Sequence, residues 1–194
     1  NSKWCLIHAT HMTKMETQAL AKTGAIAGLC PITEANLGDG IFNGPTFIEE
    51  GGTFGVGSDS NINISLTEEL RTLEYSQRLL HKERNLMLNA EGSTGEALFL
   101  GAAKGGAKAL GRHSGSIEIG KLADLLALDS TAPSLCALSN EQLFDGLVFA
   151  SKDAVVTDLW SAGRHQVRNR HHVAEDEIIK KYQKTVTDLK DRLG

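Results

Sequence analysis

Short apolar runs that alternate with helix-like segments constrain the fold of this chain more than any other feature of its sequence. Three such runs cover residues 3–8, 25–29 and 53–58, and residues 12–23 have the character of a helix. Strands that alternate with helices at intervals of roughly 20 to 30 residues form parallel β-α units. We therefore predict an α/β fold with parallel strands, and a long, turn-rich loop from residue 30 through Gly44 and Pro45.

Two longer helices are predicted after the third strand. Ser65 and Glu68 have capping-box spacing, which marks a helix start, and the leucines that follow keep helical spacing. A second helix, residues 94–110, is rich in Ala and Gly. Its glycines superficially resemble a phosphate-binding loop, but the required G-K-[ST] ending is missing, so close helix packing is the favoured interpretation.

After residue 115 the pattern changes to short strands without helices between them, which predicts a small β module. The strand candidates are residues 123–128, which we expect to be buried, 146–150, 154–161 and 165–168. Residues 164–172 are rich in Arg and His and could bind nucleic acid or metal, but a solvated edge strand is favoured. From Ala174 onward the sequence predicts an amphipathic helix with apolar residues along one stripe.

Composition excludes some classes of function. The net charge of −4 is not the basic footprint of a nucleic-acid binder, and no apolar stretch approaches the roughly 18 residues of a membrane span. The three cysteines form no C-x-x-C pair, so we expect reduced thiols and a cytoplasmic protein. The chain opens at Asn1 without an initiator Met or a signal sequence, and we expect it to be the later part of a longer polypeptide.

Two ionisable residues stand where apolar runs stop. His8 closes the first run and Asp59 closes the third. Either residue alone is more often a structural group, since such residues commonly satisfy or cap local backbone. The ends of parallel strands meet at one mouth, however, so the two side chains are expected to converge there. A His and an Asp that converge in this way could hold or serve a metal ion.

Residues 34–40 follow the middle strand at the same mouth. They could form an ordinary polar turn, but their position makes them a credible substrate loop. Its acidic residues, Glu34 and Asp39, are the candidates for contact with a substrate.

The strand ends resemble a known family. The segments that carry the resemblance are residues 6–11 (LIHATH), 28–40 (GLCPITEANLGDG), 57–61 (GSDSN) and 115–126 (GSIEIGKLADLL). They resemble the sixth to eighth strand ends of the amidohydrolase superfamily and the segment that leads into its small β-sandwich. Within that superfamily they are most similar to the formimidoylglutamate deiminases, because related purine-type deaminases usually have Ser-Asn soon after Cys-Pro, whereas residues 33–36 read TEAN.

The resemblance implies an architecture and a partner. Residues 1–114 would be the C-terminal part of a TIM (β/α)8 barrel, strands six to eight, residues 115–172 part of a small β-sandwich domain, and residues 173–194 a C-terminal helix. Three β-α units cannot close such a barrel, so the missing N-terminal half of the same polypeptide is the expected partner. A homodimer is also expected, with a small molecule as substrate and neither nucleic acid nor membrane as a partner.

The resemblance also implies the chemistry. Zinc, or another divalent metal, would be held by Asp59 and by histidines outside this chain, with His8 in contact with the substrate. The reaction would be hydrolysis of N-formimino-L-glutamate to N-formyl-L-glutamate and ammonia in histidine degradation. Zinc lowers the pKa of water to about 7, Asp59 would accept the water's proton, and His8 would contact the tetrahedral adduct. Glu34 or Asp39 would lie near the cationic amidine.

Two alternatives stay open. The chain could belong to another amidohydrolase deaminase that acts on a purine or pterin ring. It could also be a non-catalytic barrel relative used for binding or assembly. The metal ligands expected upstream of this chain would decide the second alternative, and an assay against several substrates would decide the first.

Overall fold

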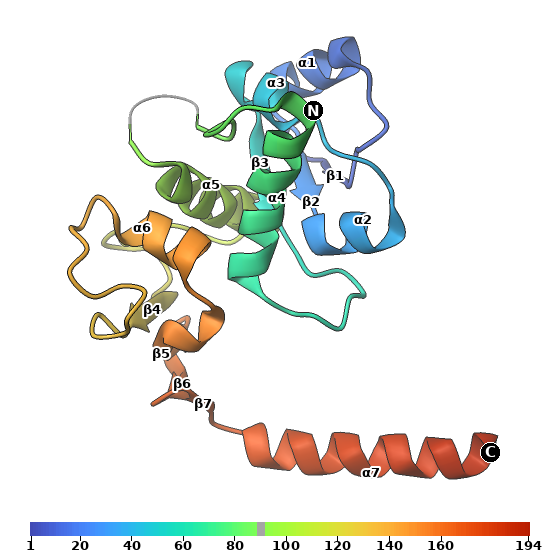
Figure 1. Cartoon of the computed structure of the whole chain (residues 1–194), viewed down its shortest axis with the longest axis vertical. Coiled ribbons are helices and arrows are strands. Elements are labelled where there is room, and N and C mark those ends of the chain that lie inside the picture. Colours follow the sequence, from blue (N-terminus) through green and yellow to red (C-terminus); the bar gives the residue numbers. More distant parts are fainter. Residues whose placement is uncertain (89–91) are drawn as a thin grey trace.

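The computed structural model of the chain describes residues 1–88 and 92–194. Its first half is built on a sheet of three parallel strands in the order β1 (Cys5–Ile7), β2 (Ile26–Leu29) and β3 (Thr53–Val56). Helix α1 (Lys14–Lys22) connects β1 to β2 (Figure 1). The predicted parallel β-α units are therefore confirmed, and each strand is shorter than its apolar run.

Two helices pack on this sheet and on each other. Helix α4 (Leu66–His81) begins at Ser65, whose hydroxyl accepts a hydrogen bond from the Glu68 backbone N–H at 3.2 Å. Helix α5 (Thr94–Ala109) packs against β2 and β3. A Cβ on Gly105 would collide with the Phe54 backbone, so this glycine lets helix and strand approach closely. The interpretation of this segment as a packed helix, and not as a phosphate loop, is confirmed.

The predicted loop between β2 and β3 was wrong, because it contains two short helices. These are α2 (Pro31–Leu37) and α3 (Gly44–Glu49), and each has a proline at its start. Proline fits the first turn of a helix, where a missing N–H leaves no hydrogen bond unmade. Phe47 of α3 is fully buried and lies edge-on to Phe42, so α3 contributes to the main core.

The main core lies between the parallel sheet and its helices. Its largest fully buried apolar side chains are Leu29, Phe42, Phe47, Leu70, Leu73, Met87 and Leu98. These residues come from β2, α3, α4, α5 and the segments between them. Side chains that follow the three strands are thus attached to a packed scaffold, which fixes where they can point.

The second half contains an antiparallel sheet. Its strands are β4 (Leu125–Leu128), β5 (Val156–Ser161), β6 (Arg164–Arg168) and β7 (His171–His172), in that order. The β module is therefore confirmed, and exposed β7 lies at its edge. Two details were wrong. Residues 146–150 form a π-helical turn after α6 (Leu143–Asp145), and β4 is only partly buried because Leu126 faces solvent.

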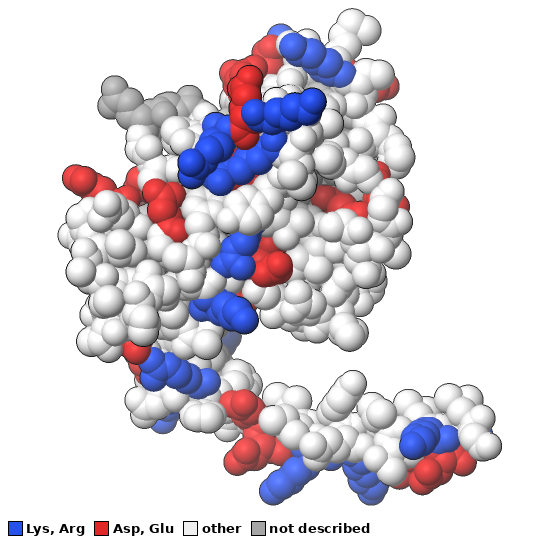
Figure 2. All heavy atoms as spheres, viewed as in Figure 1, with Lys and Arg blue, Asp and Glu red and all other residues white. Residues whose placement is uncertain are grey.

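Helix α7 (Glu175–Leu193) confirms the predicted C-terminal helix and extends away from the rest of the molecule (Figure 1). In Figure 2 many of its charged side chains gather along one side. None of its residues is buried, and apolar residues such as Tyr182 and Leu193 are largely exposed. Within the described residues, none of the helices combines the length and the apolar character that a bilayer span requires.

Candidate metal and catalytic site

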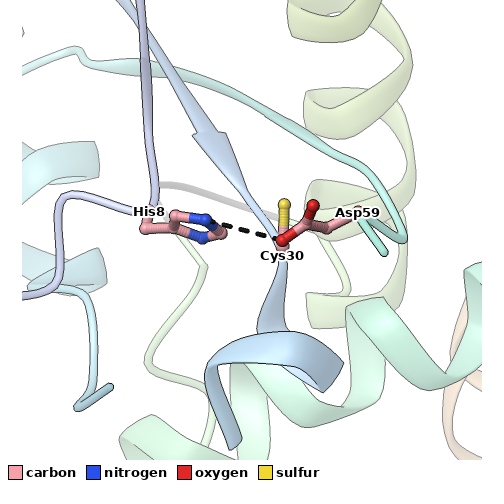
Figure 3. Close-up of side chains that lie close together, drawn as sticks. All are labelled: His8, Cys30 and Asp59. Carbon is pink, nitrogen blue, oxygen red and sulfur yellow. Dashed lines mark ion pairs between the residues drawn. The ribbon is translucent and has the colours of Figure 1, made fainter. Parts of the chain in front are cut away.

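The site lies where the three parallel strands end. His8 follows β1, Cys30 follows β2 and Asp59 follows β3, and the three side chains meet in one place (Figure 3). His8 and Asp59 both have left-handed backbone, with φ of 65° and 52°. Such backbone is costly for residues other than glycine and persists where the surrounding structure enforces it, commonly at functional sites.

The distances place His8 and Asp59 within reach of a common ligand. His8 Nε2 lies 3.6 Å from Asp59 Oδ2. One ligand atom from each of His8, Cys30 and Asp59 lies within 4.8 Å of the other two. The side chains of His8 and Asp59 are about one-third exposed, so a small molecule can reach them from solvent. The expected convergence of the two side chains is present in the structure.

Cys30 belongs to this cluster, although sequence reasoning did not select it as a site residue. Burial raises the pKa of its thiol to about 12, and the neighbouring carboxylates of Glu34 and Asp59 add to that shift. Burial thus favours the neutral thiol when no metal ion is bound, whereas a bound metal ion would favour the thiolate. Its position in the sequence could have identified it, because Cys30 follows the middle apolar run as His8 and Asp59 end the outer two.

Glu34 lies behind His8 in the first turns of α2. Its side chain is almost fully buried, and Oε1 accepts a hydrogen bond from the Cys30 backbone N–H at 2.8 Å. The same oxygen lies 3.3 Å from His8 Nδ1. Burial raises the pKa of Glu34, and the bonds from Cys30 and His8 partly offset that effect. A direct contact between Glu34 and substrate stays a prediction.

Asp39 lies on the open side of the site. A hollow of about 710 Å³ beside β1 is lined by Leu6, Ile7, His8, Ala9, Thr10, His11, Met12, Glu16 and Asp39. The hydroxyl of Thr10 donates a hydrogen bond to the Asp39 carbonyl at 2.7 Å, which ties the end of the 34–40 loop to the segment after β1. His8 and Asp39 thus border the same hollow. The role of Asp39 as a substrate contact stays a prediction.

The comparison with protein families decides the class of this fold. The model of the amidohydrolase family matches residues 1–165. The chain belongs to the amidohydrolase family. This assignment accounts for the mixed α/β content and agrees with the location of the site at the ends of parallel strands.

Known amidohydrolases resemble this chain over nearly its whole length. Formimidoylglutamate deiminase of Pseudomonas aeruginosa is 43% identical over 98% of this chain and 42% of its own length. A crystal structure of an amidohydrolase from Brucella melitensis is 49% identical, with a TM-score of 0.90 over 97% of this chain and 42% of that chain. A 5-methylthioadenosine/S-adenosylhomocysteine deaminase of Natronomonas pharaonis is 28% identical over 90% of this chain and 38% of its own length. The chain therefore spans about two-fifths of the length of these relatives.

One structural relative of this amidohydrolase chain contains a metal. An adenosine deaminase from Xanthomonas campestris, solved with bound zinc, is 25% identical, with a TM-score of 0.80 over 99% of this chain and 43% of that chain. The donor set seen here fits a divalent metal in part. The carboxylate of Asp59 and the free Nε2 of His8 are ligand types that zinc accepts. Catalytic zinc commonly has about three protein ligands, and the described residues that come together here are His8, Cys30 and Asp59.

Glu69 of α4 is a buried acid next to the site that sequence reasoning missed. Its Oε2 accepts a hydrogen bond from the Ile32 backbone N–H in the first turn of α2, at 2.9 Å. Oε1 has no hydrogen-bond partner among the described residues, and the side chain is 1% exposed. Burial raises the pKa of Glu69 to about 7. Glu69 helps to hold the start of α2, which carries Glu34.

We predict that the buried carboxyl of Glu69 makes the protein less stable as the pH rises. The folded protein retains a proton that the unfolded chain releases near the ordinary pKa of 4.5, so stability falls from about pH 4.5 until the folded form titrates near pH 7. Glu69→Gln is expected to remove roughly 1–3 kcal/mol of this dependence between pH 5 and pH 8. Urea unfolding of the complete polypeptide at the two pH values measures the difference. Glu83→Gln, the same substitution at an exposed position, is the control.

Proposed function

We propose that this chain is part of a formimidoylglutamate deiminase, which hydrolyses N-formimino-L-glutamate to N-formyl-L-glutamate and ammonia in histidine degradation. The observation that carries the proposal is the meeting of His8 Nε2 and Asp59 Oδ2 at 3.6 Å, in a chain 43% identical to such a deiminase. The deaminases among the relatives support the general class of reaction, in which water replaces nitrogen on a trigonal carbon.

The proposed architecture assigns β1, β2 and β3 to strands six, seven and eight of a (β/α)8 barrel. Residues 1–114 would complete that barrel, residues 115–172 would contribute to a small β-sandwich, and residues 173–194 would form the final helix. The support is the family assignment, the parallel order β1-β2-β3 and the separate antiparallel sheet.

In this proposal a single zinc ion would be held by Asp59 together with histidines from the rest of the polypeptide. When bound, such an ion would lower the pKa of water to about 7. The Asp59 carboxylate would accept the proton that the attacking water loses as its oxygen bonds to the formimino carbon. The support for zinc is the Asp59 carboxylate where the strand ends meet and the zinc in the Xanthomonas relative.

His8 then acts on the tetrahedral adduct. Its Nε2 faces Asp59, so once this nitrogen carries a proton it can donate a hydrogen bond to the oxygen on which negative charge develops. The proton that Asp59 took from water passes to the terminal amidine nitrogen. The bond between that nitrogen and carbon breaks as the formyl C=O bond forms, and ammonia leaves. The amide nitrogen of the glutamate part stays on the formyl carbon. Asp39, at the edge of the same hollow, is placed to attract the cationic amidine before reaction.

A purine deaminase is the second candidate, because relatives named for adenosine-type substrates are 24–30% identical to this chain. Ammonia release from N-formimino-L-glutamate, adenosine, 5-methylthioadenosine and guanine, measured with the complete polypeptide, separates the two. The proposal expects a kcat/KM for N-formimino-L-glutamate at least 100-fold above the others. Faster ammonia release from any of the purines than from N-formimino-L-glutamate would contradict the proposed substrate.

The rest of the same polypeptide is the proposed partner of this chain. β1 is an edge strand of its sheet. Ile7 within it is 57% exposed, and Trp4 just before it is 66% exposed. An open parallel edge with apolar neighbours promotes aggregation. We predict that residues 1–194 expressed alone form aggregates or unfold without cooperativity, and that the complete polypeptide restores a sharp transition. A monomer of residues 1–194 with cooperative urea unfolding would contradict this.

We also propose a cytoplasmic homodimer. The amphipathic surface of α7 and the reduced state of Cys5, Cys30 and Cys136 support this part of the proposal. Light scattering of the complete polypeptide tests the dimer, since it gives the mass of the assembly directly.

A further inference from the structure

Glu34 is buried where a substrate-binding carboxylate would be expected to face open space. Its side chain is 6% exposed and does not line the hollow that His8 and Asp39 border. Its Oε1 instead connects two parts of the protein, the His8 ring through Nδ1 at 3.3 Å and the Cys30 backbone N–H at 2.8 Å. These contacts join the end of β1 to the start of α2.

We infer that Glu34 is a positioning residue that acts through His8, holding Nδ1 so that Nε2 faces Asp59 and the reacting carbon. This inference rests on the proposed function, and it separates the role of Glu34 in α2 from that of Asp39 after α2. Glu34 orients the imidazole, and Asp39 is left to meet the substrate.

The geometry favours this role because the two ring nitrogens of His8 have different surroundings. A carboxylate accepts hydrogen bonds and cannot donate one, so Oε1 of ionised Glu34 requires a proton on Nδ1. Nε2 is then the nitrogen that can exchange a proton with the adduct, and it lies on the side of Asp59 (Figure 3). The hydrogen bond on one imidazole nitrogen commonly sets the role of the other.

The scaffold gives Glu34 a fixed position from which to hold the ring. Its carboxylate is anchored by the Cys30 N–H, and α2 is held by the bond from Ile32 to Glu69. His8 is one-third exposed at the edge of a wide hollow and has left-handed backbone. Without Glu34 the imidazole could turn into the hollow, because the His8 side chain lines that hollow.

Kinetics of the complete polypeptide test the inference through two variants. Glu34→Gln keeps an acceptor oxygen without the charge, and Glu34→Met removes the acceptor at similar size. We expect kcat to fall about 10-fold in Glu34→Gln and about 100-fold in Glu34→Met, which is the range for residues that orient a reactive group. KM should change less than twofold in both variants. Asp39→Asn should instead raise KM. The control, Glu83→Gln at an exposed position, should change neither constant. A rise in KM without loss of kcat for the Glu34 variants would overturn the inference.

A double-mutant cycle separates action through His8 from a general structural effect. If Glu34 acts through His8, Glu34→Met should lower kcat less than twofold further in a His8→Asn background. Equal losses in both backgrounds would show that Glu34 only stabilises the start of α2, and would also overturn the inference.

A readout without turnover keeps this test distinct from the test of the substrate. Nitrogen-15 NMR of histidine-labelled protein, with the His8 signal identified by its loss in His8→Asn, reports which ring nitrogen carries the proton. We expect Nδ1 to be protonated in the wild type and the pattern to change in Glu34→Met. An unchanged pattern would overturn the positioning role even in an active enzyme. If the wild type does not hydrolyse N-formimino-L-glutamate, the proposed function fails and this measurement still decides the inference.

Discussion

Asp59→Asn is expected to lower kcat by about 10³-fold or more, because the proposed mechanism uses its carboxylate twice, to hold the metal and to accept the proton from water. Asn has nearly the same size and keeps one oxygen, but it has neither the negative charge nor a base. The zinc content of the purified protein should fall as well. Ammonia release and metal analysis by atomic absorption measure the two effects.

The control for Asp59→Asn is the same change at Asp188, which lies on exposed α7. Both its kcat and its zinc content should match the wild type. If Asp59→Asn retained more than a tenth of the wild-type kcat, neither proposed role of Asp59 would stand.

His8→Asn is expected to lower kcat by about 10²- to 10⁴-fold, the range over which a positioned acid or base contributes to catalysis. In contrast to Asp59→Asn, it should leave the zinc content unchanged, since the proposed role of His8 is contact with the substrate. The different metal contents of the two variants therefore separate a metal ligand from a proton-transfer group. His81→Asn, at the exposed end of α4, is the control and should retain full activity.

Loss of zinc together with activity in His8→Asn would move His8 into the set of metal ligands. Normal turnover in this variant would remove His8 from the mechanism altogether. Either result would change the assignment of Nε2, whose 3.6 Å separation from Asp59 is compatible with a shared contact.

The three parallel strands could be predicted because local sequence determines them. Each is an apolar run bounded by polar residues, and each end of a predicted strand lies within two residues of the observed end. Helix α4 could also be predicted from the sequence, because the Ser65–Glu68 spacing that marks its start is a local pattern. The observed hydrogen bond from the Glu68 N–H to Ser65 agrees with that pattern. The reciprocal half of the capping box is absent from the described contacts, since Glu68 pairs with Arg71.

Other elements depend on tertiary packing and were missed. Residues 146–150 are apolar enough for a strand, but Gly146, Leu147 and Val148 are buried as part of a helical turn that packs on α4 and α5. Pro31 and Pro45 fall in the predicted loop, although proline is also common at a helix start. Composition alone does not distinguish these outcomes.

The site shows the same division. His8 and Asp59 could be selected because strand ends of a parallel sheet converge. Glu69 could not, because its contact with Ile32 joins residues 37 positions apart and depends on how α4 packs on α2. Glu34 was selected, but its hydrogen bonds to Cys30 and His8 became visible only in the folded chain.

The central claim is that His8 and Asp59 serve one metal centre, and a crystal structure of the complete polypeptide grown with zinc tests it most directly. Anomalous scattering at the zinc edge locates the ion without reference to activity. We predict a single peak about 2.0–2.2 Å from an Asp59 carboxylate oxygen, with His8 Nε2 facing the same space outside the coordination sphere. A zinc peak at another place, or an Asp59 carboxylate turned away from the ion, would contradict the account.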